Sequence, residues 1–250
     1  MTEPGPPAGP GRVGHALAMV LSSERVLFLA PMPAELAPLK RRLGLKRRAD
    51  DPTVRMGRHG RHDVLATTLG IGTERAAQRT AELLDTHPVD RVIVIGVAGG
   101  LVPHVEVGSV VVPEVVVDHG AGTEHVPAPH PAAGGRVLTS DEFIKEHERL
   151  HDLAADGIVA LDMETSAVGR VCDDRGVPWW AFRGISDDAF DPAVDAAVLG
   201  LTRPDGSSDP AAVARLLAAD PKRAAVLRRL ADQLRVATTA AVDAALDALT

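Results

Sequence analysis

Short apolar runs alternate with stretches of helical spacing along most of this chain, and that alternation limits the possible folds more than any other feature. Helical spacing follows two of these runs, in the Pro-opened stretch that Gly44 ends and in residues 74–87. Strands that alternate with helices predict an α/β domain with a largely parallel central sheet. The predicted strands are RVLFLA (25–30), DVLATTLG (63–70), RVIVIG (91–96), the β-branched run 107–120 with a break at Pro113, GIVAL (157–161) and PWWAFRGISD (178–187).

The two ends of the chain depart from this alternation. The first residues, MTEPGPPAGPGRVG, are rich in Pro and Gly, and we expect residues 1–24 to form a disordered leader and not a signal peptide. Residues 209–250 are rich in Ala, Leu and Arg and predict two helices that separate near residues 220–222. The length between the ends suits one core, so residues 25–250 are predicted to form a single domain with a helical C-terminal tail.

Composition argues against several classes of protein. A net charge of −7 and an aromatic content of 2% do not suit a nucleic-acid binder, which needs a basic surface and stacking side chains. The single cysteine, Cys172, excludes an internal disulfide and fits a reducing cytoplasm. No apolar run approaches 18 residues, so no membrane span is predicted. The histidines lack metal-ligand spacing, and no serine lies in a GxSxG motif, so neither a metal site nor a serine hydrolase is expected.

Three acidic residues follow predicted strands, at the edge of the sheet where α/β domains carry their function. Asp187 ends an apolar strand, where burial would raise its pKa toward that of a general acid; a helix N-cap or a turn is the alternative. Glu164 lies between a strand and a helix, so it either stabilises the helix N-terminus or accepts hydrogen bonds from a ribose diol. For Glu35 the simplest interpretation is a solvated acid, paired with Lys40 or Arg41. These residues alone leave the alternatives open.

The Gly-rich turn GVAGG (96–100) would let the backbone approach a ligand closely. It does not match GxGxxG, and no acidic residue follows at the offset that a dinucleotide site needs. The chain also lacks GxxxxGK[ST]. The turn therefore predicts a binding surface without naming its ligand.

Taken in order, six segments resemble the nucleoside phosphorylase/nucleosidase superfamily, and most closely its 5′-methylthioadenosine/S-adenosylhomocysteine nucleosidases. The resemblance spans roughly residues 25 to 190 and implies a three-layer fold with a mixed, mostly parallel sheet flanked by helices. It further implies a cytoplasmic homodimer or higher homo-oligomer that acts on a small purine nucleoside, without a cofactor, metal, nucleic acid or membrane partner. The segments are PMPAEL, GIG, IGVAGGL with VGSVVV, SDEFI, LDMET and FRGISD.

The resemblance implies a role for each matching position. The base would leave after protonation at N7, the ribose would be held through its hydroxyls, and water would attack the sugar. These roles fit an N-glycosidic bond that breaks through an oxocarbenium-like state. By resemblance, Asp187 is the acid, Ser186 orients it, and Phe143 stacks on the base. Glu164 binds the 2′ and 3′ hydroxyls, and Met163 packs under the sugar. Glu35 polarises the water with help from Arg183, and the pocket is lined by Ile71, Val97 and Gly99.

The chain also departs from the family pattern. Val97 stands where hydrolytic relatives often carry Ser, and the strand before it lacks the Arg that phosphorylases use, which favours water over phosphate. The polar loop 119–137 is shorter than in methylthioadenosine nucleosidases, and residues 191–235, which begin with a second polar loop at 191–209, are longer. Both changes in length would reshape the mouth that receives the 5′ substituent. They are reminiscent of branches that act on other adenosine or purine nucleosides, including futalosine hydrolase and adenosylhopane-processing enzymes.

Three functions are therefore compared. The leading one is hydrolysis of a 5′-modified adenosine or related purine nucleoside to free base and a ribose derivative. The alternatives are a phosphate-dependent purine nucleoside phosphorylase and a nucleoside-binding protein without turnover. The identity of the 5′ group and the choice between adenine and hypoxanthine stay open.

Overall fold

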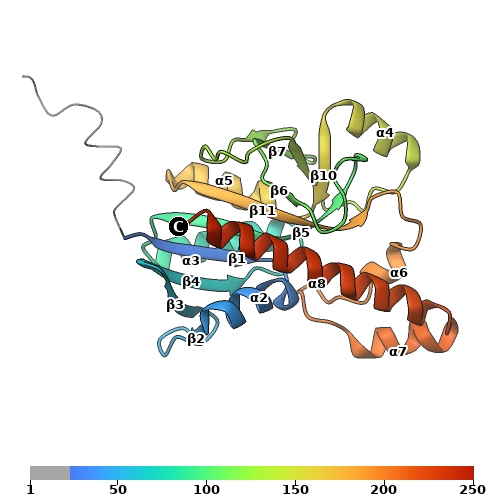
Figure 1. Ribbon diagram of the computed structural model, residues 1–250, viewed down its shortest axis with the longest axis horizontal. Coiled ribbons are helices and arrows are strands. Elements are labelled where there is room, and N and C mark those ends of the chain that lie inside the picture. Colours follow the sequence, from blue (N-terminus) through green and yellow to red (C-terminus); the bar gives the residue numbers. More distant parts are fainter. Residues whose placement is uncertain (1–22) are drawn as a thin grey trace, which may run out of the picture.

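The computed structural model describes residues 23–250, which form a mixed sheet between helices (Figure 1). Of the predicted leader 1–24, residues 1–22 lie outside the described residues, while Ser23 and Glu24 are described. The elements are β1 (Arg25–Ala30), α2 (Pro33–Leu43), β2 (Lys46–Arg47), β3 (Arg55–His59), β4 (His62–Thr68), α3 (Thr73–Thr86), β5 (Arg91–Gly100), β6 (Val110–Val111), β7 (Val115–Asp118), β8 (Glu124–His125), β9 (Arg136–Thr139), α4 (His147–Ala155), β10 (Ile158–Asp162), α5 (Thr165–Arg175), β11 (Trp179–Asp188), α6 (Ala196–Leu199), α7 (Pro210–Ala219) and α8 (Arg223–Asp247).

The strands join in the order β2-β3-β4-β1-β5-β10-β9-β7-β8, and β11 pairs with β5 and with β6. The longer central pairs are parallel: β4 with β1, β1 with β5, and β5 with β11. Antiparallel pairs occur mostly at the edges, as in β2 with β3 and β7 with β8, and where β10 meets β5. The predicted fold class, a mixed central sheet flanked by helices, is confirmed.

The alternation of side chains along β1 explains why helices cover both faces of the sheet. Leu27 and Leu29 pack on one face with residues of α3 and α5, whereas Val26 and Phe28 pack on the other with residues of α2 and α8. All four side chains are fully buried. Because successive residues of a strand point to opposite faces, a continuously apolar strand needs this cover on both sides. In Figure 1, α8 runs lengthwise across one face, and α6 and α7 lie at the end of α8 that is far from the C-terminus.

The central strand β5 has an interrupted edge. Along one edge, Arg91–Val94 pair with β1, and Gly99 and Gly100 pair with β10, which leaves residues 95–98 without a strand partner there. The other edge pairs with β11 over most of its length. Backbone groups in the gap therefore need partners other than strands, and such a gap admits side chains or a ligand.

Several element boundaries differ from the sequence prediction. The prediction of a Gly-rich turn at residues 96–100 is wrong, because β5 continues to Gly100. The strand β11 likewise continues through Asp187 to Asp188. The predicted loop 119–137 contains the short strand β8 and the start of β9, and loop 191–209 contains α6. The strands β2 and β3 and the helix α4 were not predicted, because their many charged residues leave no clear periodic spacing of apolar residues. The break at Pro113 and the end of α2 at Gly44 are confirmed.

None of the helices within residues 23–250 has both the length and the apolar character that a membrane crossing requires.

Candidate active site

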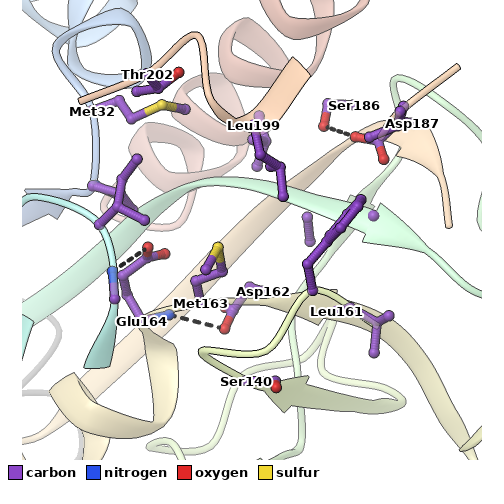
Figure 2. Close-up of a pocket in the computed structure, with 18 of the residues that line it drawn as sticks. Met32, Ser140, Leu161, Asp162, Met163, Glu164, Ser186, Asp187, Leu199 and Thr202 are labelled. Atoms are coloured by element: carbon purple, nitrogen blue, oxygen red, sulfur yellow. Dashed lines mark hydrogen bonds between the residues drawn. The ribbon is translucent and has the colours of Figure 1, made fainter. Parts of the chain in front are cut away.

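A cavity of about 630 Å³ lies at the interrupted edge of β5. This volume is within the range of small-molecule sites, about 300–1,000 Å³. The segments that follow β1, β4, β9 and β11 contribute to its lining, as does the end of β10, so the cavity lies at the carboxyl ends of the strands. Figure 2 shows Glu164 and Asp187 on different sides of it, with Met163 between them.

Glu35 fills part of the gap in the edge of β5. As the third residue of α2, it accepts a hydrogen bond at Oε2 from the backbone N–H of Met32, 2.7 Å away, which is half of a capping box. Its Oε1 accepts from the backbone N–H of Val97 at 2.8 Å. The side chain is buried, so the interpretation of a solvated acid paired with Lys40 or Arg41 is wrong.

Burial raises the pKa of Glu35 to about 7, although the charge of Arg183 and the two backbone hydrogen bonds favour the ionised form. A carboxyl group with this pKa is present in both protonation states near neutral pH. It is therefore able to accept a proton from a reacting group at physiological pH.

Glu164 is also buried, with an exposed fraction of 4%. Its Oε1 accepts from the backbone N–H of Gly72 at 3.1 Å, and its Oε2 accepts from Nη2 of Arg183 at 3.2 Å. It occupies the N-cap position of α5 but makes no side-chain hydrogen bond to that helix, because its carboxyl oxygens accept from Gly72 and Arg183 instead. Burial raises its pKa to about 8, and the nearby carboxyl groups of Asp162 and Glu35 add to this effect.

Asp162 and Arg183 form the buried support of the site. Nε of Arg183 donates to Oδ2 of Asp162 at 2.7 Å, and both side chains are buried. Asp162 also accepts from the hydroxyl of Thr139 at 2.6 Å and from the backbone N–H groups of Glu164 and Thr165, so it caps α5 in place of Glu164. Burial opposes the charge of Arg183, yet the carboxylates around it hold its pKa above the usual value.

Asp187 lies in β11, at a register shift between Ile185 and Asp187 in the pairing with β5. Its Oδ1 accepts from the hydroxyl of Ser186 at 2.5 Å. Burial raises the pKa of this carboxyl group, while the Ser186 hydrogen bond and the charge of Lys145 partly oppose the shift. Because Asp187 is a strand residue and no helix begins there, the helix N-cap interpretation is wrong.

The other predicted site residues are distributed as follows. Arg183 does not line the cavity; it is fully buried behind the wall, and its Nη1 has no hydrogen-bond partner among the described residues. A Cβ on Gly96 would lie 2.3 Å from this Nη1 and 2.7 Å from Oε1 of Glu35, so only glycine fits between them. The remaining predicted residues all line the cavity: Glu35, Ile71, Val97, Gly99, Phe143, Met163, Glu164, Ser186 and Asp187.

The opposite side of the cavity is largely apolar, and most of it comes from the C-terminal region. Figure 2 shows Met32, Leu199 and Thr202 across the cavity from Glu164. Leu199 belongs to α6 and remains 39% exposed, and Leu230 and Leu234 come from α8. Residues 191–235 were expected to reshape the mouth of the cavity. The sequence did not identify the side chains involved, because the spacing of apolar residues does not show which face of each helix meets the cavity.

Two supporting residues escaped the sequence analysis. Lys145 lines the cavity and lies in the segment that carries Phe143, and Asp141 in the same segment accepts from the backbone N–H of Thr73 at 2.8 Å. Nothing in the local sequence distinguishes either from a surface charge. By contrast, an arginine inside the apolar strand WWAFRGIS does signal a buried acidic partner, here Asp162. Within residues 23–250, no group of three or more His, Cys, Asp and Glu side chains is arranged to hold a metal ion.

The sequence model of one family, described as "Phosphorylase superfamily", matches residues 25–134 and 127–234, which together cover most of the chain. The chain belongs to the phosphorylase superfamily. Among phosphorylase-superfamily relatives, a 5′-methylthioadenosine/S-adenosylhomocysteine nucleosidase from Exiguobacterium sp. is 31% identical over 166 residues, which are 54% of this chain and 71% of that protein.

Solved structures of the phosphorylase superfamily share the fold. The apo 5′-methylthioadenosine nucleosidase of Arabidopsis thaliana superposes with a TM-score of 0.68 at 20% identity, over 91% of this chain and 95% of that one. Futalosine hydrolase of Helicobacter pylori superposes with a TM-score of 0.65 at 18% identity, over 90% and 96% of the two chains. At these identities the comparison concerns the fold.

Proposed function

We propose that this chain is a purine nucleosidase that hydrolyses the N-glycosidic bond of a 5′-modified adenosine or a related purine nucleoside. The observation that carries the proposal is the presence of Glu35, Glu164 and Asp187, from three separate segments, in the lining of one cavity. A relative that shares 31% of its residues over 71% of its length is a 5′-methylthioadenosine/S-adenosylhomocysteine nucleosidase. The reaction breaks the bond between the sugar C1′ and the base nitrogen and joins a water oxygen to C1′.

In this reaction Asp187 donates a proton to N7 of the purine, so that the base departs as a neutral molecule. The raised pKa of Asp187 supports this role, because a buried carboxyl group keeps its proton to higher pH than an exposed one. Ser186, which donates to one oxygen of Asp187, orients the acid toward the base. Phe143 stacks on the base, and Ile71 and Gly99 border it; all three line the same cavity.

Glu164 binds the 2′ and 3′ hydroxyls of the ribose, and Met163 packs against the sugar. Each oxygen of Glu164 has one hydrogen bond from the protein, and a carboxylate oxygen accepts more than one, so acceptor capacity remains for ribose hydroxyls. In its ionised form, Glu164 also stabilises positive charge that develops on the ring. Asp162 and Arg183 hold Glu164 in place from behind.

Glu35 polarises the attacking water, beside Val97. Its pKa of about 7 matches the requirement for a base near neutral pH. Arg183 assists as a positioning residue: its free Nη1 and Oε1 of Glu35 lie close together under Gly96. Gly96 leaves room for both groups, because a Cβ there would collide with each of them.

The charges of the site favour water over phosphate as the nucleophile. Glu35 already occupies the two backbone N–H groups of Met32 and Val97 that an anion would need. Arg183 is shared between Asp162 and Glu164, so its charge is already matched by carboxylates. At the Glu35–Glu164 end of the cavity a phosphate dianion would therefore meet two acidic groups, and Arg183, the cation behind them, is already paired.

The apolar side of the cavity supports an apolar 5′ substituent. Met32, Leu199 and Leu234 give this side an apolar surface, and the charged lining residue next to it in sequence is Arg203. A thioalkyl group would bury its surface there at a gain of roughly 0.8 kcal/mol per CH₂. We also propose, from the family resemblance, that the protein is a cytoplasmic homodimer or higher homo-oligomer.

Product analysis tests this proposal. Methylthioadenosine, adenosylhomocysteine, inosine, futalosine and 5′-alkylthioadenosines of increasing length are each incubated with the protein, with and without phosphate. We expect free base and free sugar in both conditions, with alkylthioadenosines cleaved fastest. A sugar 1-phosphate would instead support the phosphorylase, and ligand-dependent stabilisation without base release over hours would support the binding protein.

A further inference from the structure

Lys145 makes contacts that connect two segments of the site. It lies between β9 and α4, two residues after Phe143, and its side chain lines the cavity. Its Nζ donates to the backbone carbonyls of Ala189 at 2.7 Å and Asp191 at 3.0 Å, in the turn that directly follows β11. The ammonium group also lies 5.3 Å from the ring centre of Phe143, within the range of a cation–π contact.

The electrostatic surroundings of Lys145 are strongly acidic. Burial lowers the pKa of Lys145, and four carboxyl groups oppose this effect: Asp187, Asp191, Asp188 and Asp195. Two of these four have arginine partners of their own. Asp191 pairs with Arg229 at 2.7 Å, and Asp195 pairs with Arg223. Asp187 has no arginine or lysine within ion-pair distance among the described residues, so Lys145 is the cation whose charge acts on it.

We infer that Lys145 is a positioning residue for the proposed reaction: it ties the segment that carries Phe143 to the turn that follows Asp187, and it keeps a positive charge beside that acid. The inference rests on the proposed function, since it concerns the acid that protonates the base. Two backbone carbonyls fix the position of the ammonium group, so its charge is held and does not move freely in solvent.

The charge has a predictable effect on the acid. The groups that act on the Asp187 carboxyl are the Ser186 hydroxyl and Lys145, which favour its ionised form, and Asp191 and Asp188, which oppose it. Removal of the Lys145 charge therefore raises the pKa of Asp187 further. The protonated acid then persists to higher pH, and the alkaline limb of the rate profile moves upward.

The test compares Lys145→Gln and Lys145→Met with Lys145→Arg. Glutamine keeps a donor for the carbonyls without the charge, methionine keeps the length alone, and arginine keeps the charge. We expect kcat to fall about tenfold to a hundredfold in both neutral variants, because the acid and the stacking ring lose their common anchor. We expect the alkaline limb of kcat/KM to move upward by about one pH unit in these variants and to stay near the wild-type position in Lys145→Arg.

Controls separate this inference from the proposed function. Thermal melts identify which neutral variant is folded, and the folded one is used. Without base release by the wild-type protein, the proposed function itself fails. If the wild-type protein releases base and a folded neutral variant keeps the wild-type alkaline limb, the inference about Lys145 is overturned, whatever the change in kcat.

Discussion

The two sides of the cavity are built in different ways. On the polar side, Glu35, Glu164 and Arg183 come from elements packed on or within the sheet, and all three are buried and joined by hydrogen bonds to backbone or to one another. On the apolar side, Leu199 and Leu234 come from α6 and α8, and neither is fully buried. In Figure 1, α6 and α7 extend from one end of the sheet, whereas β5 lies at its centre.

This difference indicates that the two sides of the cavity have different roles. A network of buried hydrogen bonds restricts atoms to one arrangement, which suits proton transfer and attack on the sugar. Partly exposed apolar side chains tolerate changes of shape, which suits selection among 5′ substituents. Substitutions on the polar side should therefore affect rate and stability, whereas those on the apolar side should affect which substrate binds.

Among the variants that test the difference between the two sides, the largest effect is expected from the smallest change on the polar side, Gly96→Ala. A Cβ there would lie 2.3 Å from Nη1 of Arg183 and 2.7 Å from Oε1 of Glu35, so both must move. A displacement of about 1 Å at reacting groups costs roughly a hundredfold in rate. We expect kcat to fall by at least that factor, measured as base release. Gly134→Ala is the matched control, because a Cβ at Gly134 meets no atom within 4 Å. Equal activity of the two variants would contradict the tight fit.

The next effect concerns the stability of the polar side as pH changes. Burial raises the pKa of Glu164 from 4.5 to about 8, so its carboxyl group keeps a proton in the folded state that it loses in the unfolded state. The stabilisation from this residue is present below pH 4.5 and is lost as pH rises from 4.5 toward 8.

Glu164→Gln removes that titration. From pH 5 to pH 8, the free energy of unfolding of the variant should improve relative to wild type by on the order of 2 kcal/mol, measured by urea denaturation. Glu114→Gln, at an exposed acid, serves as the control and should show no such trend. A constant difference between Glu164→Gln and wild type across this pH range would contradict the raised pKa.

The smallest effect is expected on the apolar side. Leu199→Ala with Leu234→Ala removes apolar surface that a 5′-alkyl group would contact equally in the ground state and in the transition state. The KM for a long 5′-alkylthioadenosine should then rise about fivefold to tenfold with kcat unchanged. Val126→Ala changes an apolar residue that is 67% exposed and outside the cavity lining, and it should leave both constants unchanged. A loss of kcat in the double variant would argue against the division between the two sides.

The same difference explains what the sequence predicted and what it did not. The strand β1 is apolar after Arg25, β5 is apolar after Arg91, and β11 begins with an apolar run, so their positions and the α/β class followed from the pattern alone. Glu35, Glu164 and Asp187 were found because each lies at or soon after the end of a strand predicted from its apolar residues, β1, β10 and β11 respectively. These three residues line one cavity because of the order of the strands in the sheet. No local segment of the sequence determines that order.

Other features had no local signal. The break in the pairing of β5 at residues 95–98 depends on where β1 ends and where β10, which runs antiparallel to β5, ends; these two elements are far apart in sequence. The contact of Lys145 with Ala189 and Asp191 joins positions more than 40 residues apart, and its charge alone resembles that of any surface lysine. The apolar wall was assigned to the mouth of the site, but only the packing of α6 and α8 identifies its side chains.

Base release by Asp187→Asn tests the central claim most directly, because asparagine keeps the size of the acid and removes the proton that the departing base requires. Turnover of a cleaved 5′-modified adenosine should fall by about 10² to 10⁴-fold, the usual contribution of general acid catalysis, while the nucleoside still raises the melting temperature of the variant. Turnover within a few-fold of wild type by a folded, nucleoside-binding Asp187→Asn protein would contradict the account.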